Sequence, residues 1–169
     1  MAPEIEKRIF AVLVDNEPGV LARVAGMFAA RAFNIDSLAV GRTEDAETSR
    51  MTIVVVGDDK VVEQVRKQLA KIVSVVKVQD FVGQDVVARD LMLLTVTVQP
   101  EKRPEIMSLV EMFTAKVVDI GPKFVMVEVC GPETKIEAFI DSCRPYGVKS
   151  VVRTGTVAMA RYNRAKSEQ

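Results

Sequence analysis

A short polar turn that contains Asn16, together with an asparagine eighteen residues after Asn16, is the part of this chain best suited to bind a small molecule. The turn, residues 15–19, contains Asp15, Asn16 and Gly19, and joins an apolar stretch to an amphipathic stretch that ends near Asn34. The first backbone N–H groups of a helix have no partner within it and can hold a carboxylate. Side-chain oxygens of Asp15, Asn16 or Asn34 suit an ammonium group. The pattern therefore favours an amino-acid receptor, although an ordinary capped turn uses the same residue types and spacing alone leaves that reading open.

Catalytic and metal-binding chemistry have little support in the composition. The chain contains no histidine, so it lacks the commonest general base near pH 7 and the commonest metal ligand. Its two cysteines, Cys130 and Cys143, cannot form a zinc site without further ligands and are expected to be small core residues. The carboxylates fall in expected loops and helix caps. We expect no catalytic residue, no metal site and no cofactor in this chain.

The balance of charge argues against nucleic-acid and membrane partners. Lys plus Arg and Asp plus Glu both number 23, whereas binding to nucleic acid or an anionic surface usually depends on a basic face. RNA-binding domains of comparable topology need exposed aromatics for base stacking, and the apolar stretch at 50–56 has none. No apolar run approaches the roughly 20 residues of a membrane span. Few cysteines and no export signal predict a cytoplasmic protein.

The elements around the turn follow a strand–helix–strand–strand–helix–strand order. Strands are expected at 8–14, 34–40, 50–56 and 73–80. The first helix, residues 18–31, has Pro18 in its first turn and a stripe of apolar side chains at Leu21, Val24, Ala25, Phe28 and Ala32. The second helix is capped by Asp58 or Asp59 and has its stripe at Val61, Val62, Val65 and Leu69.

The same order appears again in the second half of the chain. Strands are expected at 90–98, 116–120, 123–129 and 148–158, with helices at 103–115 and after Pro132. The predicted fold class is α+β, with two ferredoxin-like βαββαβ domains, each a four-stranded antiparallel sheet with two helices on one face. The predicted domains are residues 1–82 and 83–161, followed by a polar tail at 162–169.

The open face of the first predicted sheet calls for a partner. The strands at 8–14 and 50–56 are apolar on both faces. We therefore expect that face to be covered by the second domain or by another subunit. Exposed sheet edges also favour dimerisation by side-by-side pairing.

The first half resembles an ACT domain, the small amino-acid-sensing module of metabolic enzymes. The matching segments are the strand at 9–14, the turn at 15–21, the helix end at 31–35 and the strand at 50–53. A closer similarity, to the small regulatory subunit of acetolactate synthase (acetohydroxyacid synthase), rests on residues 34–38, 49–53, 57–58 and 68–72 and on a second half of this length. The similarity extends to about Arg161, and it is specific over 8–80 and looser over 81–161.

This resemblance implies a non-catalytic subunit of branched-chain amino acid biosynthesis. Such a subunit activates a large catalytic subunit, which carries thiamine diphosphate, Mg and FAD, and confers allosteric feedback inhibition by valine or another branched-chain amino acid. It forms a homodimer through the ACT domain, and valine lies between the two copies. The residues implied for valine binding are Asn16, Gly19, Val20 and Leu21 of one copy and Asn34 and Ile35 of the other.

Two further points bear on this implied function. The corresponding turn of the second half, residues 99–104, has neither Gly nor Asn and contains two prolines, so it is not expected to bind an amino acid in this way. The alternative function is a free-standing ACT-domain sensor that regulates a different enzyme.

Overall fold

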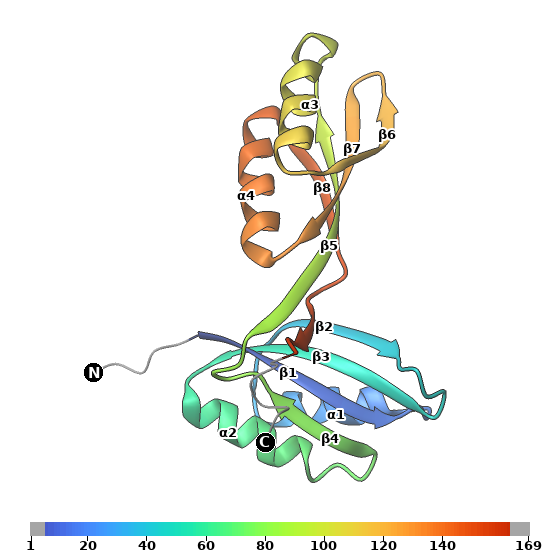
Figure 1. Ribbon diagram of the computed structural model, residues 1–169, viewed down its shortest axis with the longest axis vertical. Coiled ribbons are helices and arrows are strands. Elements are labelled where there is room, and N and C mark those ends of the chain that lie inside the picture. Colours follow the sequence, from blue (N-terminus) through green and yellow to red (C-terminus); the bar gives the residue numbers. More distant parts are fainter. Residues whose placement is uncertain (1–5, 163–169) are drawn as a thin grey trace, which may run out of the picture. The chain divides into compact units, whose positions relative to one another are not determined.

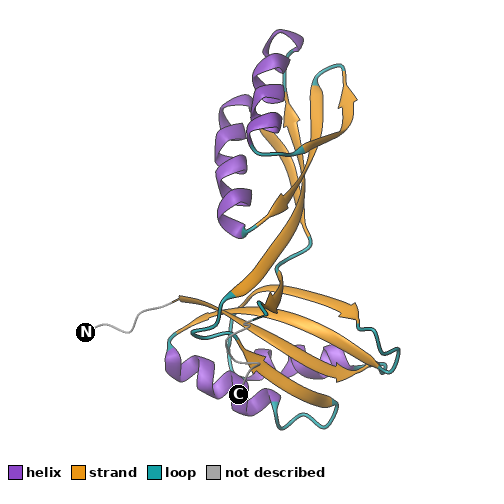
Figure 2. Cartoon of the chain, in the orientation of Figure 1, coloured by secondary structure: helices purple, strands orange, loops and turns teal. Residues whose placement is uncertain are grey.

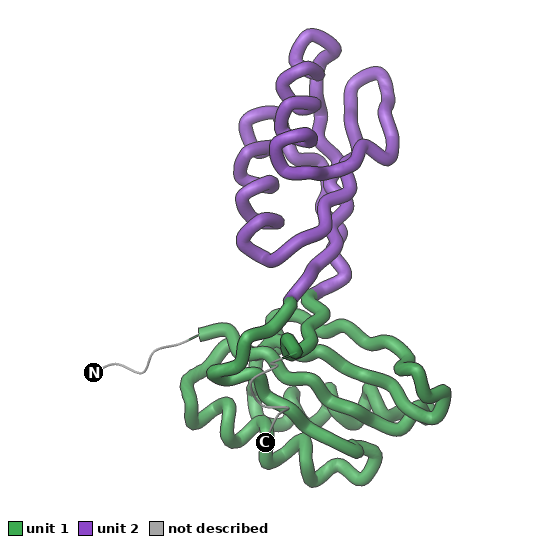
Figure 3. Tube along the Cα trace, in the orientation of Figure 1, with its two compact units in different colours: residues 1–87, 156–169 green, residues 88–155 purple. Residues whose placement is uncertain are grey.

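The computed structural model describes residues 6–162 of the 169-residue chain, which form two compact units. The first unit combines the chain up to Val87 with residues from Thr156 onward, and the second runs from Ala88 to Gly155 (Figure 3). The domain division predicted from the sequence lies after residue 82, with residues 83–161 in the second domain. In the structure the division lies five residues later, and residues 156–162 belong to the first unit. Residues 163–169 of the predicted tail lie outside the described residues.

The first unit is a four-stranded antiparallel sheet with two helices on one face (Figure 1). Its strands pair in the order β2-β3-β1-β4. The elements are β1 (Glu6–Asp15), α1 (Val20–Ala30), β2 (Ile35–Arg42), β3 (Thr48–Gly57), α2 (Asp59–Leu69) and β4 (Val75–Asp80). This arrangement confirms the predicted ferredoxin-like order.

Alternation along the strands and a helical stripe on each helix build the core of this unit. Its buried members are Phe10, Val12, Val14, Val20, Val24, Phe28, Met51, Ile53, Val55, Val62, Val65 and Leu69. Asp58 caps α2 by accepting a hydrogen bond from the Val61 N–H at 2.9 Å, as expected from the sequence.

The start of α1 differs from the prediction. The helix begins at Val20 instead of residue 18, because Gly19 adopts a left-handed conformation with φ 87° immediately before it. Pro18 therefore lies in the turn. The buried stripe runs through Val20, Val24 and Phe28, while Leu21 and Ala25 of the predicted stripe are exposed.

The sheet face opposite α1 and α2 is also largely closed. Ala11, Thr52 and Val54 on that face are less than 8% exposed. Strand β9 (Val157–Ala160) lies against β1 and buries Ala158, which is 4% exposed. The Arg161 N–H donates to the Asp85 carbonyl at 2.9 Å, and the Thr156 N–H reaches the Ser37 hydroxyl at 3.4 Å. The C-terminal segment 156–161 thus covers part of the face for which a partner was expected.

The second unit repeats the order of the first, with both helices on one face of its sheet (Figure 2). Its strands pair in the order β6-β7-β5-β8, and β9 also pairs with β5, whose first two residues belong to the first unit. The elements are β5 (Val86–Thr97), a 3-10 turn at Pro100–Lys102, α3 (Arg103–Met112), β6 (Lys116–Gly121), β7 (Phe124–Gly131), α4 (Glu133–Cys143), a 3-10 turn at Arg144–Tyr146, and β8 (Val148–Arg153).

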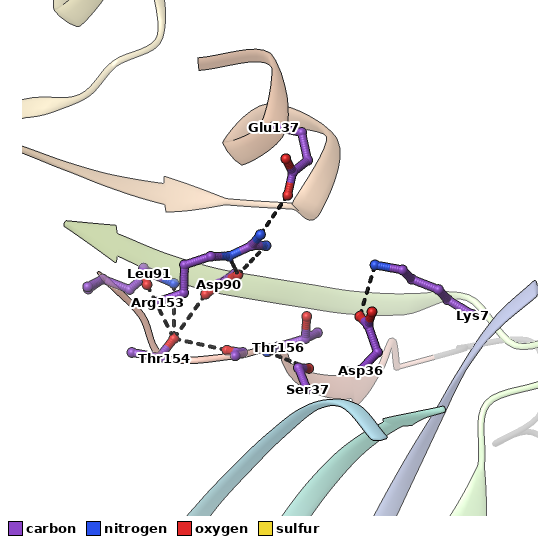
Figure 4. Close-up of polar contacts among 10 residues, drawn as sticks. Lys7, Asp36, Ser37, Asp90, Leu91, Glu137, Arg153, Thr154 and Thr156 are labelled. Carbon is purple, nitrogen blue, oxygen red and sulfur yellow. Dashed lines mark hydrogen bonds and ion pairs between the residues drawn. The ribbon is translucent and has the colours of Figure 1, made fainter. Parts of the chain in front are cut away.

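The predicted last strand, 148–158, is interrupted in the structure. β8 ends at Arg153, Gly155 has φ 83°, and β9 begins at Val157. The Thr154 hydroxyl accepts from the Leu91 N–H at 3.1 Å, which fixes the chain at the point where β8 ends (Figure 4). The single strand predicted from the sequence is thus two strands in the structure.

Candidate functional site

The turn between β1 and α1 is joined to the β2–β3 hairpin through Asn16. The Asn16 Nδ2 donates to the Ala46 carbonyl at 3.0 Å, and its Oδ1 accepts from the Ser49 hydroxyl at 3.1 Å. The Asn16 backbone N–H donates to the Glu47 carbonyl at 2.8 Å. Each end of the side-chain amide therefore has one partner in the protein. These hydrogen bonds let Asn16 stabilise the turn.

A second set of contacts joins the same turn to the start of β4. The Asp15 N–H donates to the Ser74 carbonyl at 2.9 Å, and Arg23 Nη1 donates to the Ser74 hydroxyl at 2.7 Å. Ser74 is 3% exposed. The turn is thus fixed on two sides before any ligand arrives, which lowers the entropic cost of binding.

Gly19 leaves the N-terminus of α1 open. It precedes the helix without a side-chain cap, and no acidic residue occupies the first helical turn. A Cβ built at Gly19 has nothing within 4 Å, so the space beside it is free. Among the described residues, no acceptor contacts the backbone N–H groups of Leu21 and Ala22. By contrast, α2 has both the Asp58 cap and Asp59 in its first turn. The N-terminus of α1 therefore has the donors and the positive dipole end that bind an anion.

Val20 and Leu21 play different parts next to this open end. Val20 is 2% exposed and belongs to the core, so only its backbone can face a ligand. Leu21 is 46% exposed and offers an apolar surface beside the turn. The side chain of Leu21, and not that of Val20, is available to contact an aliphatic group.

Asn34 and Ile35 lie at the other end of α1. Asn34 is exposed and precedes β2, whereas Ile35 is partly buried, pairs with Val55 and packs against the core. An 11-residue helix separates Gly19 from this end, which corresponds to about 16 Å. One chain therefore does not bring Asn16 and Asn34 together.

The equivalent helix start in the second unit is chemically different. Pro100 and Pro104 carry no N–H group, and Glu105 places a carboxylate in the first turn of α3. A second anion at this end would be repelled.

Three residues that fix the turn were not singled out from the sequence: Arg23, Ser49 and Ser74. Ser49 carries a local signal, because it continues the buried row of Met51, Ile53 and Val55 with a hydroxyl. A polar side chain in such a row predicts a nearby partner. Arg23 and Ser74 carry no comparable signal, since their contact joins positions 51 residues apart.

Within residues 6–162, no cluster of three or more His, Cys, Asp or Glu side chains is arranged to hold a metal ion. None of the helices in that range is long and apolar enough to span a bilayer. The turn before α1 thus combines an uncapped helix N-terminus with open space at Gly19.

Two family models match the chain, one over each half. Residues 10–77 match the AHAS small subunit-like ACT domain, and residues 89–162 match the small subunit of acetolactate synthase. Together they cover most of both sheets.

Curated relatives and a solved structure agree with these matches over the length of the chain. The probable acetolactate synthase small subunit of Archaeoglobus fulgidus is 54% identical over 158 residues, covering 94% of this chain and 99% of the relative. The acetolactate synthase small subunit of Bacillus subtilis is 45% identical over 162 residues, covering 95% and 94%. The crystal structure of the small subunit from Thermotoga maritima superimposes with a TM-score of 0.87 at 41% identity, covering 94% and 99%. The chain thus belongs to the family of acetolactate synthase small subunits.

Proposed function

We propose that this chain is the regulatory subunit that activates the catalytic large subunit of acetolactate synthase and confers feedback inhibition by valine. The observation that carries the proposal is the open N-terminus of α1 behind Gly19, where two backbone N–H groups have no acceptor among the described residues. The valine carboxylate binds these donors. The exposed Leu21 side chain contacts the aliphatic part of the ligand.

The second half of the binding site comes from another copy of the chain. Asn34 and Ile35 lie at the far end of α1 in the same chain, so a homodimer is needed to place them opposite the turn. Valine then bridges two subunits and favours one arrangement of the dimer. Inhibition follows if that arrangement differs in its affinity for, or effect on, the catalytic subunit.

This chain contributes regulation and no chemistry of its own in this proposal. The absence of histidine from the sequence supports that assignment. Thiamine diphosphate, Mg and FAD belong to the catalytic partner. The purified chain is expected to convert no pyruvate alone, to raise the turnover of the catalytic subunit, and to make that turnover sensitive to valine.

Calorimetric titration with valine tests the binding site directly. The wild type is compared with Asn16→Ala, which removes the amide, and Gly19→Asp, which places a carboxylate at the helix N-terminus. Gly83→Asp is the matched control, because Gly83 also has positive φ, at 68°, and open space around it. We expect weaker binding in the first two variants and wild-type affinity in the control. Equal affinity in all four proteins would disprove the site.

Mixing experiments test the partner. Acetolactate formation from pyruvate is measured for the catalytic subunit alone, for this chain alone and for the mixture, each with and without valine. Turnover by this chain alone, or no effect on the catalytic subunit, contradicts the proposal. Capture of a different enzyme from native lysate, with no effect on acetolactate synthase, would favour a free-standing sensor instead.

A further inference from the structure

Ser49 is a buried hydroxyl at the end of an apolar row. The helix-facing positions of β3 are Val55, Ile53 and Met51, all at most 2% exposed, and Ser49 continues this row with 8% exposure. Leaving a buried hydroxyl without a partner is costly. The Ser49 hydroxyl is satisfied by the Asn16 Oδ1 at 3.1 Å, across 33 residues of sequence.

The Ser49 hydroxyl and the Ala46 carbonyl hold the two ends of the Asn16 amide. Oδ1 accepts from Ser49 at 3.1 Å, and Nδ2 donates to the Ala46 carbonyl at 3.0 Å. Rotation of the amide by half a turn would set Oδ1 against the Ala46 carbonyl oxygen, so the carbonyl selects the orientation and the Ser49 hydrogen bond holds the amide in place. Asn16 retains one N–H and one lone pair for a ligand.

The same amide is part of a hydrogen-bonded hairpin loop, residues 43–47. The Glu47 carbonyl accepts from the Asn16 N–H at 2.8 Å, and the Glu47 N–H donates to Asp45 Oδ1 at 3.0 Å. Two further hydrogen bonds close the loop. The Thr43 N–H donates to the Thr48 carbonyl at 3.2 Å, and the Thr48 N–H donates to the Asp45 carbonyl at 3.1 Å. Movement of Asn16 must therefore alter the hairpin, and movement of the hairpin must alter Asn16.

We propose that Ser49 is a positioning residue for the valine site and that occupancy of the site stiffens the 43–47 hairpin through Asn16. This inference rests on the proposed function, because it takes valine as the ligand of the turn. The hairpin joins β3 to β2, which is an edge strand of the sheet. The Ser49–Asn16–Ala46 contacts therefore connect the ligand to the sheet edge without any displacement of the core. Since such coupling is reciprocal, a loosened hairpin weakens valine binding.

Substitutions that remove or keep the hydroxyl test the positioning role. Valine affinity is measured by calorimetry for Ser49→Ala, Ser49→Thr and a control, Ser142→Ala. Ser142 is a helical serine of the second unit whose hydroxyl donates to the Ala138 carbonyl. We expect about five- to tenfold weaker binding for Ser49→Ala, the usual effect of one lost hydrogen bond, with most of the affinity restored in Ser49→Thr and none lost in the control. A threonine variant that binds no better than the alanine variant contradicts the role of the hydroxyl.

A double-mutant cycle tests whether Ser49 acts through Asn16. If it does, Ser49→Ala combined with Asn16→Ala weakens binding no more than Asn16→Ala alone. Additive losses overturn the route through Asn16. If Ser49→Ala binds valine like the wild type while Asn16→Ala does not, this inference fails and the proposed site stands. If neither substitution changes affinity, the proposed site fails as well.

Hydrogen exchange in the wild type tests the coupling without any substitution. Saturating valine is expected to slow exchange at the N–H groups of Asn16, Glu47 and Thr48, while amides of β7 in the second unit serve as the reference. Calorimetrically detected valine binding that leaves the three hairpin-linked amides unchanged overturns the inference, even if both Ser49 variants prove unstable.

Discussion

Arg153 donates from Nε to Oδ2 of Asp90 over 2.6 Å, and Asp90 is 2% exposed although it carries a charge. Arg153 also donates from Nη1 to Oε1 of Glu137 at 2.6 Å, and the Thr154 hydroxyl lies 3.1 Å from Asp90 Oδ1 (Figure 4). Burial alone would lower the pKa of Arg153, but its hydrogen bonds to Asp90 and Glu137 outweigh that effect and raise it. These contacts hold β5 and β8 in register beside α4 in the second unit.

Removal of the Asp90 carboxylate should destabilise the second unit. Asp90→Ala removes one of the two carboxylates that accept hydrogen bonds from Arg153 and creates a cavity. We therefore expect a loss of about 2–3 kcal/mol in the free energy of unfolding. The measurement is urea unfolding followed by circular dichroism, with hydrogen exchange identifying the transition of residues 88–155. Asp141→Ala is the control, because the Asp141–Arg144 pair is about two-thirds exposed on both sides and should matter by less than about 0.5 kcal/mol. Equal effects of the two substitutions would contradict this account.

Two glycines of the first unit should respond in opposite directions to alanine. Gly19 has φ 87°, so Gly19→Ala is expected to cost about 1 kcal/mol although no atom obstructs its Cβ. Gly26 lies within α1 with open space around it, so Gly26→Ala should stabilise the protein by up to about 1 kcal/mol. Thermal unfolding of both variants checks the signs, and a stabilising Gly19→Ala would contradict the left-handed turn.

Alkaline pH should destabilise the second unit through Cys143. Burial raises the pKa of its thiol from 9.0 to about 11. Between these pH values the thiol loses its proton in the unfolded chain and keeps it in the folded chain. Ionisation therefore lowers the free energy of the unfolded state alone, and the free energy of unfolding decreases. The contribution of the protonated Cys143 thiol to the free energy of unfolding is fully present below pH 9. It falls by about 2–3 kcal/mol as the pH rises to 11.

The cysteine effect is separated from other titrations by comparing slopes. Urea unfolding is measured from pH 8 to pH 11 for the wild type, Cys143→Ala and Cys130→Ala. Cys143→Ala should be less stable at pH 8, because it creates a cavity, but should lose stability less steeply with pH. Cys130→Ala is the control for removal of a thiol, because Cys130 is exposed. Parallel curves for all three would argue against ionisation of Cys143.

The fit of β9 against the first sheet predicts a sharp difference between two adjacent positions. Ala158 is 4% exposed, whereas Met159 is 64% exposed. Ala158→Asp should therefore detach segment 156–161 from β1, while Met159→Asp should have little effect. Limited proteolysis of the segment and binding of a hydrophobic dye report the outcome. Equal protease resistance in the two variants would show that the segment does not depend on Ala158.

Local patterns were sufficient to predict most elements of both units. Short apolar runs at 8–14 and 50–56 placed β1 and β3, and Asp58 or Asp59 before an apolar stripe placed the start of α2, because these signals lie within a few residues of the element that they define. The predicted start of α1 is two residues too early, because the left-handed Gly19 lies outside the helix. That shift exchanges Val20 for Leu21 in the core.

Contacts between distant residues were not predictable in the same way. The segment 148–158 reads as one strand, and the break at Thr154 and Gly155 accompanies contacts with Asp90 and Leu91, more than 60 residues away. The partners of Asn16 on the hairpin are likewise 30 and 33 residues away. The sequence identified the turn as a candidate site, but which hydrogen bonds hold it depends on the folded sheet.

The placement of residues 156–162 in the first unit has a consequence for synthesis of the protein. The ribosome completes the sheet strands β1 to β4 first, then the whole second unit, and only afterwards segment 156–161, which lies against β1. The nascent first unit therefore lacks this cover on its sheet while the next 68 residues, 88–155, are translated. Interruption of translation within that interval would release a chain prone to aggregation, which makes the final residues of this segment a checkpoint for completed folding.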